Sequence, residues 1–367
     1  MTKERNSLSL RQKIGQLFFV GLPGPEIDAE AHELLDEISP GGICLFARNI
    51  REPEQTRTLL DDVRELLPFE PLLSVDQEGG LVDRLRRITT PMPAASKVRD
   101  EEDARELAAI IGEALLTLGF NMDFAPVVDV IDDRRSKFTN GLFSREFGRS
   151  ADDVVALAGT FLDTLQAAGC IGCLKHFPGL GASTVDSHEE LPLVDIDESE
   201  FDRIDLHPYR ALFATGAVHA VMVAHAAYPG LKLQEKDKSG KLLPASLSKS
   251  FITTLLRSRL GFEGLVITDD LEMGAIIKNY GVGEACKMAI QAGADMLAIC
   301  ADPARIREGY RAVVIAAETG EVTDGRIDRS LARIAETRNL LHAPKPFSAE
   351  KLAQLSERTH ALIQRLA

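Results

Sequence analysis

The sequence predicts an α/β fold, a (β/α)8 TIM-type barrel in a single domain with a C-terminal helical tail. Short apolar runs recur along the chain, and segments whose apolar residues follow helical spacing separate them. The connections that leave the third to sixth runs are long, whereas those that enter the runs are short. In a barrel these long connections lie together on the C-terminal face, where functional sites are built.

Eight segments are predicted as strands because they are short and apolar. They lie near Leu17–Val20, Gly42–Phe46, Leu72–Val75, Met122–Val127, Ile171–Leu174, Ala220–Ala224, Leu265–Ile267 and Met296–Ile299. Amphipathic helices are predicted between them, among them Pro53–Leu67, Glu102–Leu118, Asp152–Ala168, Ser199–Thr215, Lys249–Leu260 and Ala304–Glu318. Pro53 suits a first helical turn. Glycines that suit helix ends precede the following strands: Gly119, Gly169, Gly216, Gly261 and Gly293.

The same alternation would also fit a doubly wound open sheet. Such a sheet usually carries a phosphate-binding G-x-G-x-x-G after its first strand, and Gly21-Leu22-Pro23-Gly24 matches this pattern poorly. We therefore predict a barrel over residues 1–341. Pro344 and Pro346 then interrupt the chain, and residues 342–367 are predicted to form a helical tail that packs on the barrel.

Composition excludes several classes of function. The formal net charge of -14 and the pI of about 5.1 argue against a nucleic-acid partner. The chain has no run of about twenty apolar residues, so no membrane span is expected. Its start lacks the apolar centre of a signal peptide, so a cytoplasmic location is expected. No cofactor is indicated, and the oligomeric state is left open.

The five cysteines are predicted to be buried free thiols. An odd count in a chain of this size does not suggest a disulfide framework. Cys170-Ile171-Gly172-Cys173 is formally a C-x-x-C motif, but it leads into a strand, whereas a redox motif usually opens a helix. No second pair is present to complete a four-thiolate metal site.

Polar side chains collect where the predicted strands end. The long connections there are Gln77–Asp100, Asp129–Ser150, Pro178–Asp197 and Ala226–Ser248. The candidate residues at these strand ends are Asp76, Arg84, Asp129, Arg145, Lys175, His176, Asp186, His188, His225 and Asp269. In a barrel they would become neighbours around one rim, although they are distant in sequence.

Two of these positions suit the hydrolysis of a glycosidic bond, which needs a carboxylate and a proton donor. Asp269 ends an apolar strand that would fix its position, and alternation along the strand suggests that only one of Asp269 and Asp270 faces the pocket. Equally, both could cap the next helix. His188 could give and take back a proton, and Asp186 could orient its ring. Nearby glycines, Gly179 and Gly181, would let this loop move.

The remaining candidates suit binding. A buried Lys175 would need a partner such as Asp76, or a substrate hydroxyl that it and His176 could bind. A structural ion pair at the barrel mouth is the alternative. Arg84 and Arg145 could hold hydroxyls, an amide or a carboxylate. Four other arginines are expected to be solvated: Arg86, Arg87, Arg134 and Arg135.

Taken together, these motifs resemble glycoside hydrolase family 3, in its bacterial β-N-acetylhexosaminidase branch. The resemblance runs from Ile14 to about Thr337. It is carried by Gly41–Ile50, Asp76–Gly80, Lys175–Gly181, Asp186-Ser187-His188, Pro244–Ser248 and Ile267–Met273. Each motif is weak alone, but their order and spacing are specific.

The resemblance implies a retaining glycosidase that removes terminal β-linked N-acetylglucosamine, typically from cell-wall fragments being recycled. It implies that Asp269 is the nucleophile and that His188 is the acid/base in a dyad with Asp186. It also implies sugar binding by Asp76, Arg84, Arg145, Lys175 and His176. Two positions depart from the family pattern, because Leu180 replaces a common histidine and Leu81 a common arginine.

Several alternatives stay open on the sequence. A β-glucosidase or a glycoside phosphorylase would use the same chemistry, since a histidine repels phosphate less than a carboxylate does. A Schiff-base aldolase would use Lys175. A metal-dependent hydrolase could use His176, His188, His225 and Asp269. A sugar-binding module without catalysis would not need Asp269.

Overall fold

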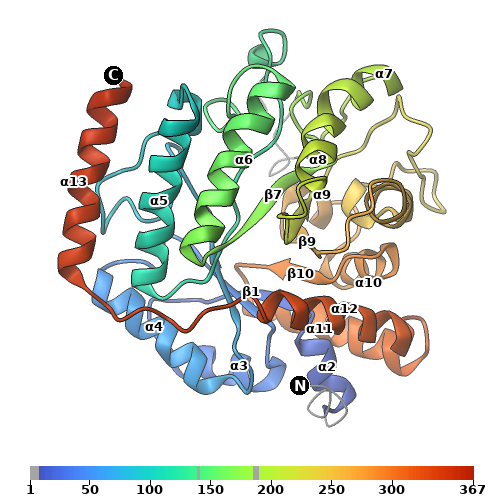
Figure 1. The fold of residues 1–367 in the computed structure, drawn as a ribbon. Coiled ribbons are helices and arrows are strands. Elements are labelled where there is room, and N and C mark those ends of the chain that lie inside the picture. The colour runs from blue at the N-terminus through green and yellow to red at the C-terminus, as the bar shows by residue number, and fades with distance from the viewer. Residues whose placement is uncertain (1–7, 139–140, 185–189) are drawn as a thin grey trace.

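The computed structural model describes residues 8–138, 141–184 and 190–367. In these residues, eight parallel strands close into a barrel, with helices around it (Figure 1). The barrel strands, in order around it, are β1 (Phe18–Gly21), β2 (Gly42–Leu45), β3 (Leu72–Val75), β6 (Met122–Asp123), β7 (Ile171–Phe177), β8 (Ala220–Val223), β9 (Leu265–Asp270) and β10 (Met296–Ile299). The structure therefore confirms the predicted (β/α)8 barrel.

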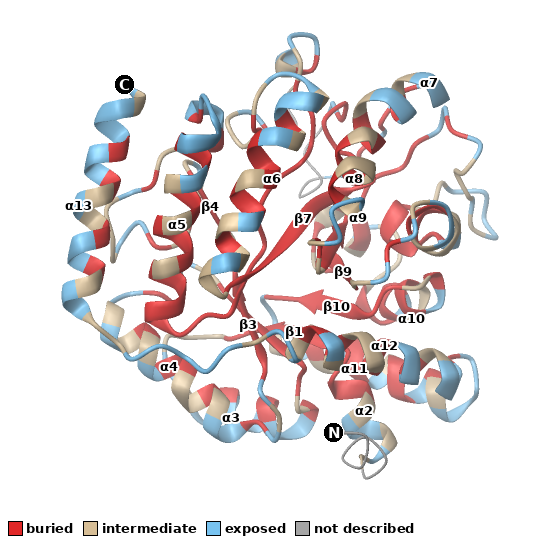
Figure 2. Ribbon diagram, in the orientation of Figure 1, coloured by how far each residue is buried: buried red, intermediate tan, exposed pale blue. Residues whose placement is uncertain are grey.

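Most strand residues are apolar because both faces of the barrel strands are covered, and the charged residues of β7 and β9 lie toward the C-terminal ends of those strands. Every residue of β1, β2, β3, β8 and β10 is buried. The helices lie outside the barrel, with buried stripes facing the strands and exposed residues facing away (Figure 2). Parallel strands in this setting read as continuous hydrophobic runs, which is why the sequence pattern was clear.

The helices begin and end where the sequence supplies caps. The side chain of Ser150 accepts a hydrogen bond from the backbone N–H of Asp153 at 3.1 Å, and the helix it starts ends at Gly169 with φ of 106°. The α-helices are α2 (Leu10–Gly15), α3 (Ala29–Ile38), α4 (Pro53–Leu66), α5 (Glu101–Leu118), α6 (Ala151–Ala168), α7 (Glu198–Glu200), α8 (Leu206–Phe213), α9 (Gly274–Ile277), α10 (Val282–Ala292), α11 (Pro303–Glu318), α12 (Asp324–Arg338) and α13 (Ala349–Leu366).

Some elements differ from the expectation. Strand β6 is shorter than predicted, with two residues, whereas β7 continues to Phe177 and so carries Lys175 and His176 within the strand. This extension is possible because Val127, beyond the end of β6, still pairs with Lys175. The segment Ser250–Arg259 is π-helical. Helices α3, α10 and α12 were not predicted individually.

The long connections carry small elements of their own. The β3–α5 connection contains an antiparallel ribbon of β4 (Gln77–Gly79) and β5 (Val82–Asp83) and a 3₁₀ turn, Ala95–Lys97. Two more 3₁₀ turns, Arg135–Lys137 and Ala245–Leu247, lie in the connections after β6 and β8. A π-helical turn, Phe201–Asp205, joins α7 to α8.

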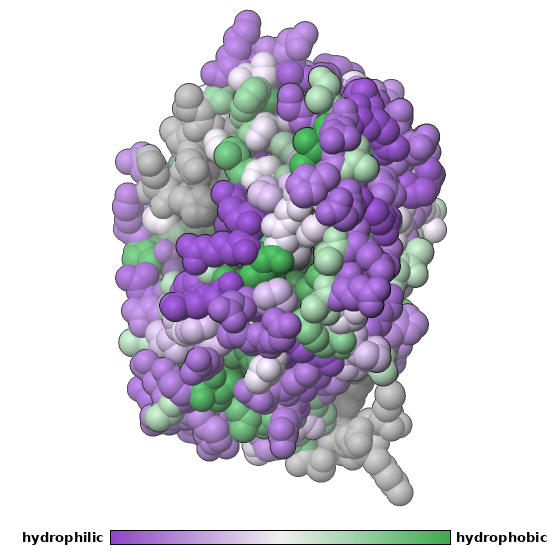
Figure 3. Space-filling view, turned by 90° about the vertical axis from the view of Figure 1, so that its left-hand side faces the viewer, coloured by the Kyte–Doolittle hydropathy of each residue, from purple (hydrophilic) through white to green (hydrophobic). Residues whose placement is uncertain are grey.

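The C-terminal helix α13 lies beside α5 on the outside of the barrel (Figure 1). Its apolar stripe is buried at Leu352, Leu355 and Leu362. Arg358 donates hydrogen bonds to Glu106 at 3.0 and 3.1 Å and to Glu113 at 2.8 Å, which ties the helix to α5. The face of the molecule that includes this helix is mostly hydrophilic (Figure 3). In the described residues, no helix is long and apolar enough to span a membrane.

Candidate active site

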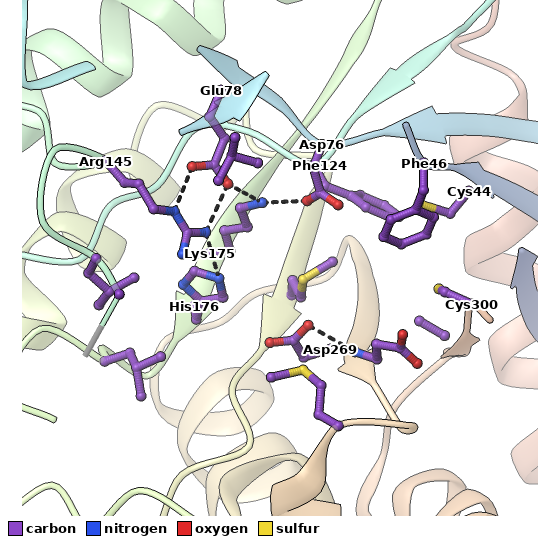
Figure 4. Close-up of a pocket in the computed structure, with 18 of the residues that line it drawn as sticks. Cys44, Phe46, Asp76, Glu78, Phe124, Arg145, Lys175, His176, Asp269 and Cys300 are labelled. Atoms are coloured by element: carbon purple, nitrogen blue, oxygen red, sulfur yellow. Dashed lines mark hydrogen bonds and ion pairs between the residues drawn. The ribbon is translucent and has the colours of Figure 1, made fainter. Parts of the chain in front are cut away.

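A cavity of about 360 Å³ opens among the C-terminal ends of the barrel strands. Six of the candidate residues named from the sequence line this cavity. Their roles in binding or catalysis remain a prediction. Five of them carry charged or hydrogen-bonding groups from the ends of three strands, β3, β6 and β7, or from the loops that follow them, and Asp269 faces them across the cavity (Figure 4). The six are Asp76, Arg84, Arg145, Lys175, His176 and Asp269.

Lys175 is held by two carboxylates. Its ammonium nitrogen lies 2.6 Å from Asp76 Oδ1 and 2.6 Å from Glu78 Oε1, and only 2% of its side chain is exposed. Burial alone would lower the pKa of Lys175, but Asp76 and Glu78 raise it well above its usual value. Lys175 is therefore a permanent cation in the wall of the cavity.

Glu78 joins Lys175 to Arg145. The guanidinium of Arg145 donates from Nε to Glu78 Oε2 at 2.8 Å and from Nη2 to Oε1 at 2.9 Å, a two-pronged pair. Burial alone would raise the pKa of Glu78, but Arg145 and Lys175 hold it well below its usual range. Four charged side chains, Asp76, Lys175, Glu78 and Arg145, are thus fixed in one network before any substrate binds.

His176 extends this network. Its Nδ1 lies 2.7 Å from Asp129 Oδ2, and Arg145 Nη2 lies 3.4 Å from its Nε2. Because a carboxylate only accepts and a guanidinium only donates, the ring carries its hydrogen on Nδ1 and accepts at Nε2. Asp129 also accepts the backbone N–H of Leu180 at 2.6 Å, so it fixes both the ring and the start of the next loop.

Asp269 and Asp270 are the last two residues of strand β9, and both residues line the cavity. The expectation that only one of the two side chains points into the pocket stays a prediction. Burial raises the pKa of Asp270 to about 7. His225 donates from Nε2 to the carbonyl of Asp270 at 3.0 Å and accepts from Ser246 at Nδ1, at 2.7 Å.

Arg84, from the connection after β3, lies over the ring of Phe46, with 5.6 Å between the guanidinium carbon and the ring centroid. Its Nε is buried and has no hydrogen-bond partner among the described residues. A buried N–H without a partner is costly. Since Arg84 lines the cavity, this donor suits a hydroxyl or amide oxygen of a bound ligand.

Asp186 and His188 lie outside the described residues. The start of their loop is described, and it is held in place. The carbonyl of Gly179 accepts a hydrogen bond from the Tyr228 hydroxyl at 2.9 Å, and both Gly179 and Gly181 are buried. A Cβ at Gly179 would meet Asp205, and one at Gly181 would meet the carbonyl of Val130. These glycines allow close packing at the start of the loop, and the expectation that they let the loop move stays a prediction.

Arg135 was expected to be solvated, and this was wrong. Its side chain is 0% exposed and forms two hydrogen bonds to Asp205, each of 2.8 Å, with a third to Glu200 at 2.9 Å. The residue comes from the connection after β6, and Asp205 comes from the turn before α8. The pair therefore joins two long connections beside the cavity, a long-range contact that a loop sequence alone does not reveal.

The sequence reasoning also missed several lining residues. Glu78 appeared only as part of a motif, although it is the centre of the ion-pair network. Glu78 could have been proposed as a site residue because it lies two positions after Asp76, in a loop that follows an apolar strand. Other lining residues that were not assigned to the site include Cys44, Phe46, Phe124, Met222 and Cys300.

Two of the alternatives do not fit this geometry. A Schiff-base lysine must lose its proton easily, whereas Lys175 is held as a cation by two carboxylates. A metal site would need free ring nitrogens, but His225 and His176 each use both of theirs. Among the described residues, no group of three or more metal-binding side chains is arranged to hold an ion.

The two departures from the family pattern lie in different settings. Leu180 is buried and lines the cavity, so the loss of a polar group there changes its wall. Leu81 is 66% exposed at the turn between β4 and β5.

A carboxylate that faces fixed cationic and hydrogen-bonding groups at the C-terminal mouth of a (β/α)8 barrel defines a glycoside hydrolase type of site. A model of the glycosyl hydrolase family 3 N-terminal domain matches residues 9–337. The chain therefore belongs to glycoside hydrolase family 3.

Curated relatives and solved structures agree with this family. The chain is 35% identical over 287 residues to a beta-hexosaminidase from Psychromonas ingrahamii, covering 76% of this chain and 81% of the relative. It is 36% identical over 288 residues to one from Pseudomonas aeruginosa, covering 77% and 81%.

Among solved structures, a family 3 beta-N-acetylglucosaminidase from Paenibacillus sp. FPU-7 aligns with a TM-score of 0.86 at 36% identity. The alignment covers 97% of this chain and 69% of that protein. A beta-N-acetylhexosaminidase from Beutenbergia cavernae aligns with a TM-score of 0.81 at 28% identity, covering 91% and 99%.

Proposed function

We propose that this protein is a β-N-acetylhexosaminidase that removes terminal β-linked N-acetylglucosamine with retention of configuration. The observation that carries the proposal is the position of the Asp269 carboxylate, at the end of β9 and in one cavity with the network of Lys175, Glu78 and Arg145. The names of the relatives at 35 and 36% identity support the choice of sugar.

In the proposed reaction, Asp269 attacks the anomeric carbon and the bond to the leaving oxygen breaks. His188 gives its proton to that oxygen, and Asp186 orients its ring. Water then attacks the covalent glycosyl-enzyme, and His188 takes back a proton, which restores both groups. Two inversions at the same carbon give net retention.

The charged network suits the role of a sugar-binding wall. An ammonium group has three N–H donors, and Asp76 and Glu78 use two of those on Lys175, so the third is left for a hydroxyl. The unpartnered Nε of Arg84 offers another donor. Because these groups are already held in place, little side-chain entropy is lost when the sugar binds.

The barrel and the tail have different proposed tasks. Every residue that lines the cavity lies at or before Cys300, which supports a catalytic barrel in residues 1–341. Residues 342–367 form the tail, whose helix covers the apolar side of α5. We propose that the tail stabilises the barrel and takes no part in the reaction.

We propose fragments of cell-wall glycan as the natural substrate and the cytoplasm as the location. All five cysteines are free and buried, as predicted, which suits a reducing compartment. A small soluble glycan fragment would also fit a cavity of about 360 Å³, which has room for a sugar residue but not for a long chain.

The test is a panel of p-nitrophenyl glycosides, each assayed with and without inorganic phosphate. The expected result is highest kcat/KM for the β-N-acetylglucosaminide, no increase with phosphate, and a β-configured first product by NMR. A preference for the β-glucoside would instead identify a β-glucosidase. Formation of a sugar 1-phosphate would identify a phosphorylase. An α-configured first product would overturn retention.

A further inference from the structure

Asp129 is a buried carboxylate that takes no part in the proposed chemical steps. It follows strand β6, is 1% exposed and is not one of the described residues that line the cavity. Its two oxygens bind different parts of the chain. Oδ2 accepts the ring Nδ1–H of His176 at 2.7 Å and the backbone N–H of His176 at 3.2 Å, and Oδ1 accepts the backbone N–H of Leu180 at 2.6 Å. Both partners line the cavity, so one carboxylate holds two parts of its wall.

On the side of His176, Asp129 decides what the ring offers to the cavity. The ring hydrogen stays on Nδ1 because a carboxylate oxygen can only accept it, so Nε2 is an acceptor. Nε2 lies 3.4 Å from Arg145 Nη2, and Arg145 in turn pairs with Glu78 (Figure 4). Asp129 therefore extends the charged network of the cavity by one buried carboxylate, with donors and acceptors matched at each step.

On the side of Leu180, the contact lies at the start of the connection that follows β7. Two further contacts fix this part of the chain. Gly181 packs so closely against the residue after Asp129 that a Cβ would lie 2.3 Å from the Val130 carbonyl oxygen. Ser183 donates its backbone N–H to the Leu180 carbonyl at 3.0 Å. The first residues of this connection are therefore fixed relative to Asp129.

We propose that Asp129 is a positioning residue for the glycosidase reaction, which holds His176 and the start of the loop that carries His188 in one fixed relation. The inference rests on the proposed function, in which His176 binds the sugar and His188 protonates the leaving oxygen. A proton donor must come within hydrogen-bond reach of that oxygen while the sugar is held. A single carboxylate that binds both elements keeps the sugar contact and the proton donor aligned with each other.

Asparagine at this position separates the two contacts. An amide has one oxygen and one NH2 group, so Asp129→Asn can accept on only one of its two sides. An oxygen placed toward His176 satisfies two N–H groups, whereas an oxygen placed toward Leu180 satisfies one. The variant should therefore keep the contacts of His176 and leave the Leu180 N–H facing another donor, which costs free energy in a buried position.

The test measures pre-steady-state release of the leaving group from a series of aryl N-acetylglucosaminides. Asp129→Asn should slow glycosylation by about 10-fold or more for poor leaving groups, part of the roughly 10²- to 10⁴-fold that a positioned acid contributes, and far less for activated ones. KM should stay close to that of wild type, because His176 keeps its contacts. Hydrogen exchange measured by mass spectrometry should be faster in the peptide that contains Leu180.

Two further variants complete the test. Gly181→Ala leaves Asp129 unchanged but pushes the loop away from Val130, so it should show the same dependence on the leaving group. It also takes the place of Asp129→Asn if circular dichroism shows that Asp129→Asn is unfolded. Asp103→Asn is the matched control and should match wild type, since Asp103 is equally buried but lies in α5, outside the barrel, and pairs with Arg99.

The proposal is overturned if Asp129→Asn, or Gly181→Ala in its place, keeps the wild-type dependence on the leaving group, or if Asp103→Asn changes that dependence equally. Equal losses for good and poor leaving groups would also overturn it, because they would indicate a general disturbance of the site. Wild type that hydrolyses none of these glycosides would overturn the proposed function instead. The exchange rate of the peptide that contains Leu180 would then still decide whether Asp129 holds the loop.

Discussion

The backbone N–H of Asp270 donates a hydrogen bond to the Asp269 carboxylate, with 2.8 Å between Asp270 N and Asp269 Oδ1. The carbonyl of Asp270 is in turn held by His225 at 3.0 Å. Burial lowers the pKa of His225, so this ring is neutral near pH 7 and its Nε2–H is a fixed donor. The peptide groups of Asp270 thus link the Asp269 carboxylate to His225, and this fixes the carboxylate before substrate binds.

The first prediction concerns the nucleophile. Asp269→Ala should lose nearly all turnover, because no carboxylate is left to form the covalent intermediate. Its folding should be close to that of wild type, since Asp269 is only partly buried. An activated 2-fluoro sugar should label the wild-type enzyme at Asp269, as found by peptide mass spectrometry. A label on Asp270, or wild-type turnover in Asp269→Ala, would contradict the assignment.

The second prediction concerns pH and stability. Asp270 has a pKa of about 7 in the folded protein, raised by burial, against about 3.9 when unfolded. The folded state therefore holds this proton more tightly, and the stability that it contributes is present below pH 4 and is lost as the pH rises through 7. As the pH rises from 4 to 7, the free energy of unfolding of wild type should fall by on the order of 4 kcal/mol relative to that of Asp270→Asn.

Urea unfolding of both proteins at several pH values between 4 and 8 measures this difference. The control is Asp133→Asn, since the Asp133 side chain is fully exposed and its variant should follow wild type at every pH. A constant difference between wild type and Asp270→Asn across this range would show that Asp270 ionises normally.

The third prediction concerns Glu78. Glu78→Gln would leave the cations of Lys175 and Arg145 facing each other without the carboxylate that joins them. Breaking a buried ion pair typically costs about 3–5 kcal/mol, and we expect a loss of this order in urea unfolding. KM should rise as well, because Lys175 would no longer be held toward the sugar.

An exposed ion pair provides the control. Glu318 pairs with Arg11 at 3.5 Å, and the two side chains are 49% and 63% exposed. Glu318→Gln should change the free energy of unfolding by no more than about 1 kcal/mol and leave KM unchanged. Equal free energies of unfolding for Glu78→Gln and Glu318→Gln would show that the ion pairs of Glu78 do not stabilise the fold.

The fold could be predicted from the sequence because the buried parallel strands of a barrel form short, largely apolar runs. Runs such as Phe18–Val20 and Met296–Ile299 are apolar throughout, and charged residues that follow several of the runs, such as Asp76 after Leu72–Val75, mark the C-terminal ends. The same rule placed Asp76, Lys175 and Asp269 at one rim, and the structure puts them in one cavity.

The pairings within the site could not be predicted in this way. Which carboxylate Lys175 meets depends on the β4–β5 ribbon, which turns Glu78 inward, and short strands of this kind leave little trace in sequence. The burial of Arg135 could not be predicted either, because its partner Asp205 is 70 residues away in the sequence. Cys44 and Cys300 both line the cavity from the strands on either side of β1, which the sequence does not reveal until the strand order is known.

The last prediction concerns the acid/base. His188→Ala should strongly slow the glycosylation step for substrates with poor leaving groups, because their leaving oxygen must be protonated as the bond breaks. Activated aryl glycosides need little proton donation, so their glycosylation should be affected far less. Asp186→Ala should show a weaker form of the same pattern, since it only orients the ring and tunes its pKa. The measurement is the pre-steady-state release of the leaving group across a series of aryl N-acetylglucosaminides.

The slope of log rate against leaving-group pKa is the deciding quantity. Wild type should give a shallow slope and His188→Ala a steep one, because without an acid the rate depends on the stability of the departing anion. His207→Ala is the matched control: His207 is partly exposed, pairs with Asp152 on the outside of the barrel, and should keep the wild-type slope. Equal losses for good and poor leaving groups in His188→Ala would exclude His188 as the acid. Glu190, the first described residue after that loop, would then be the next position to test.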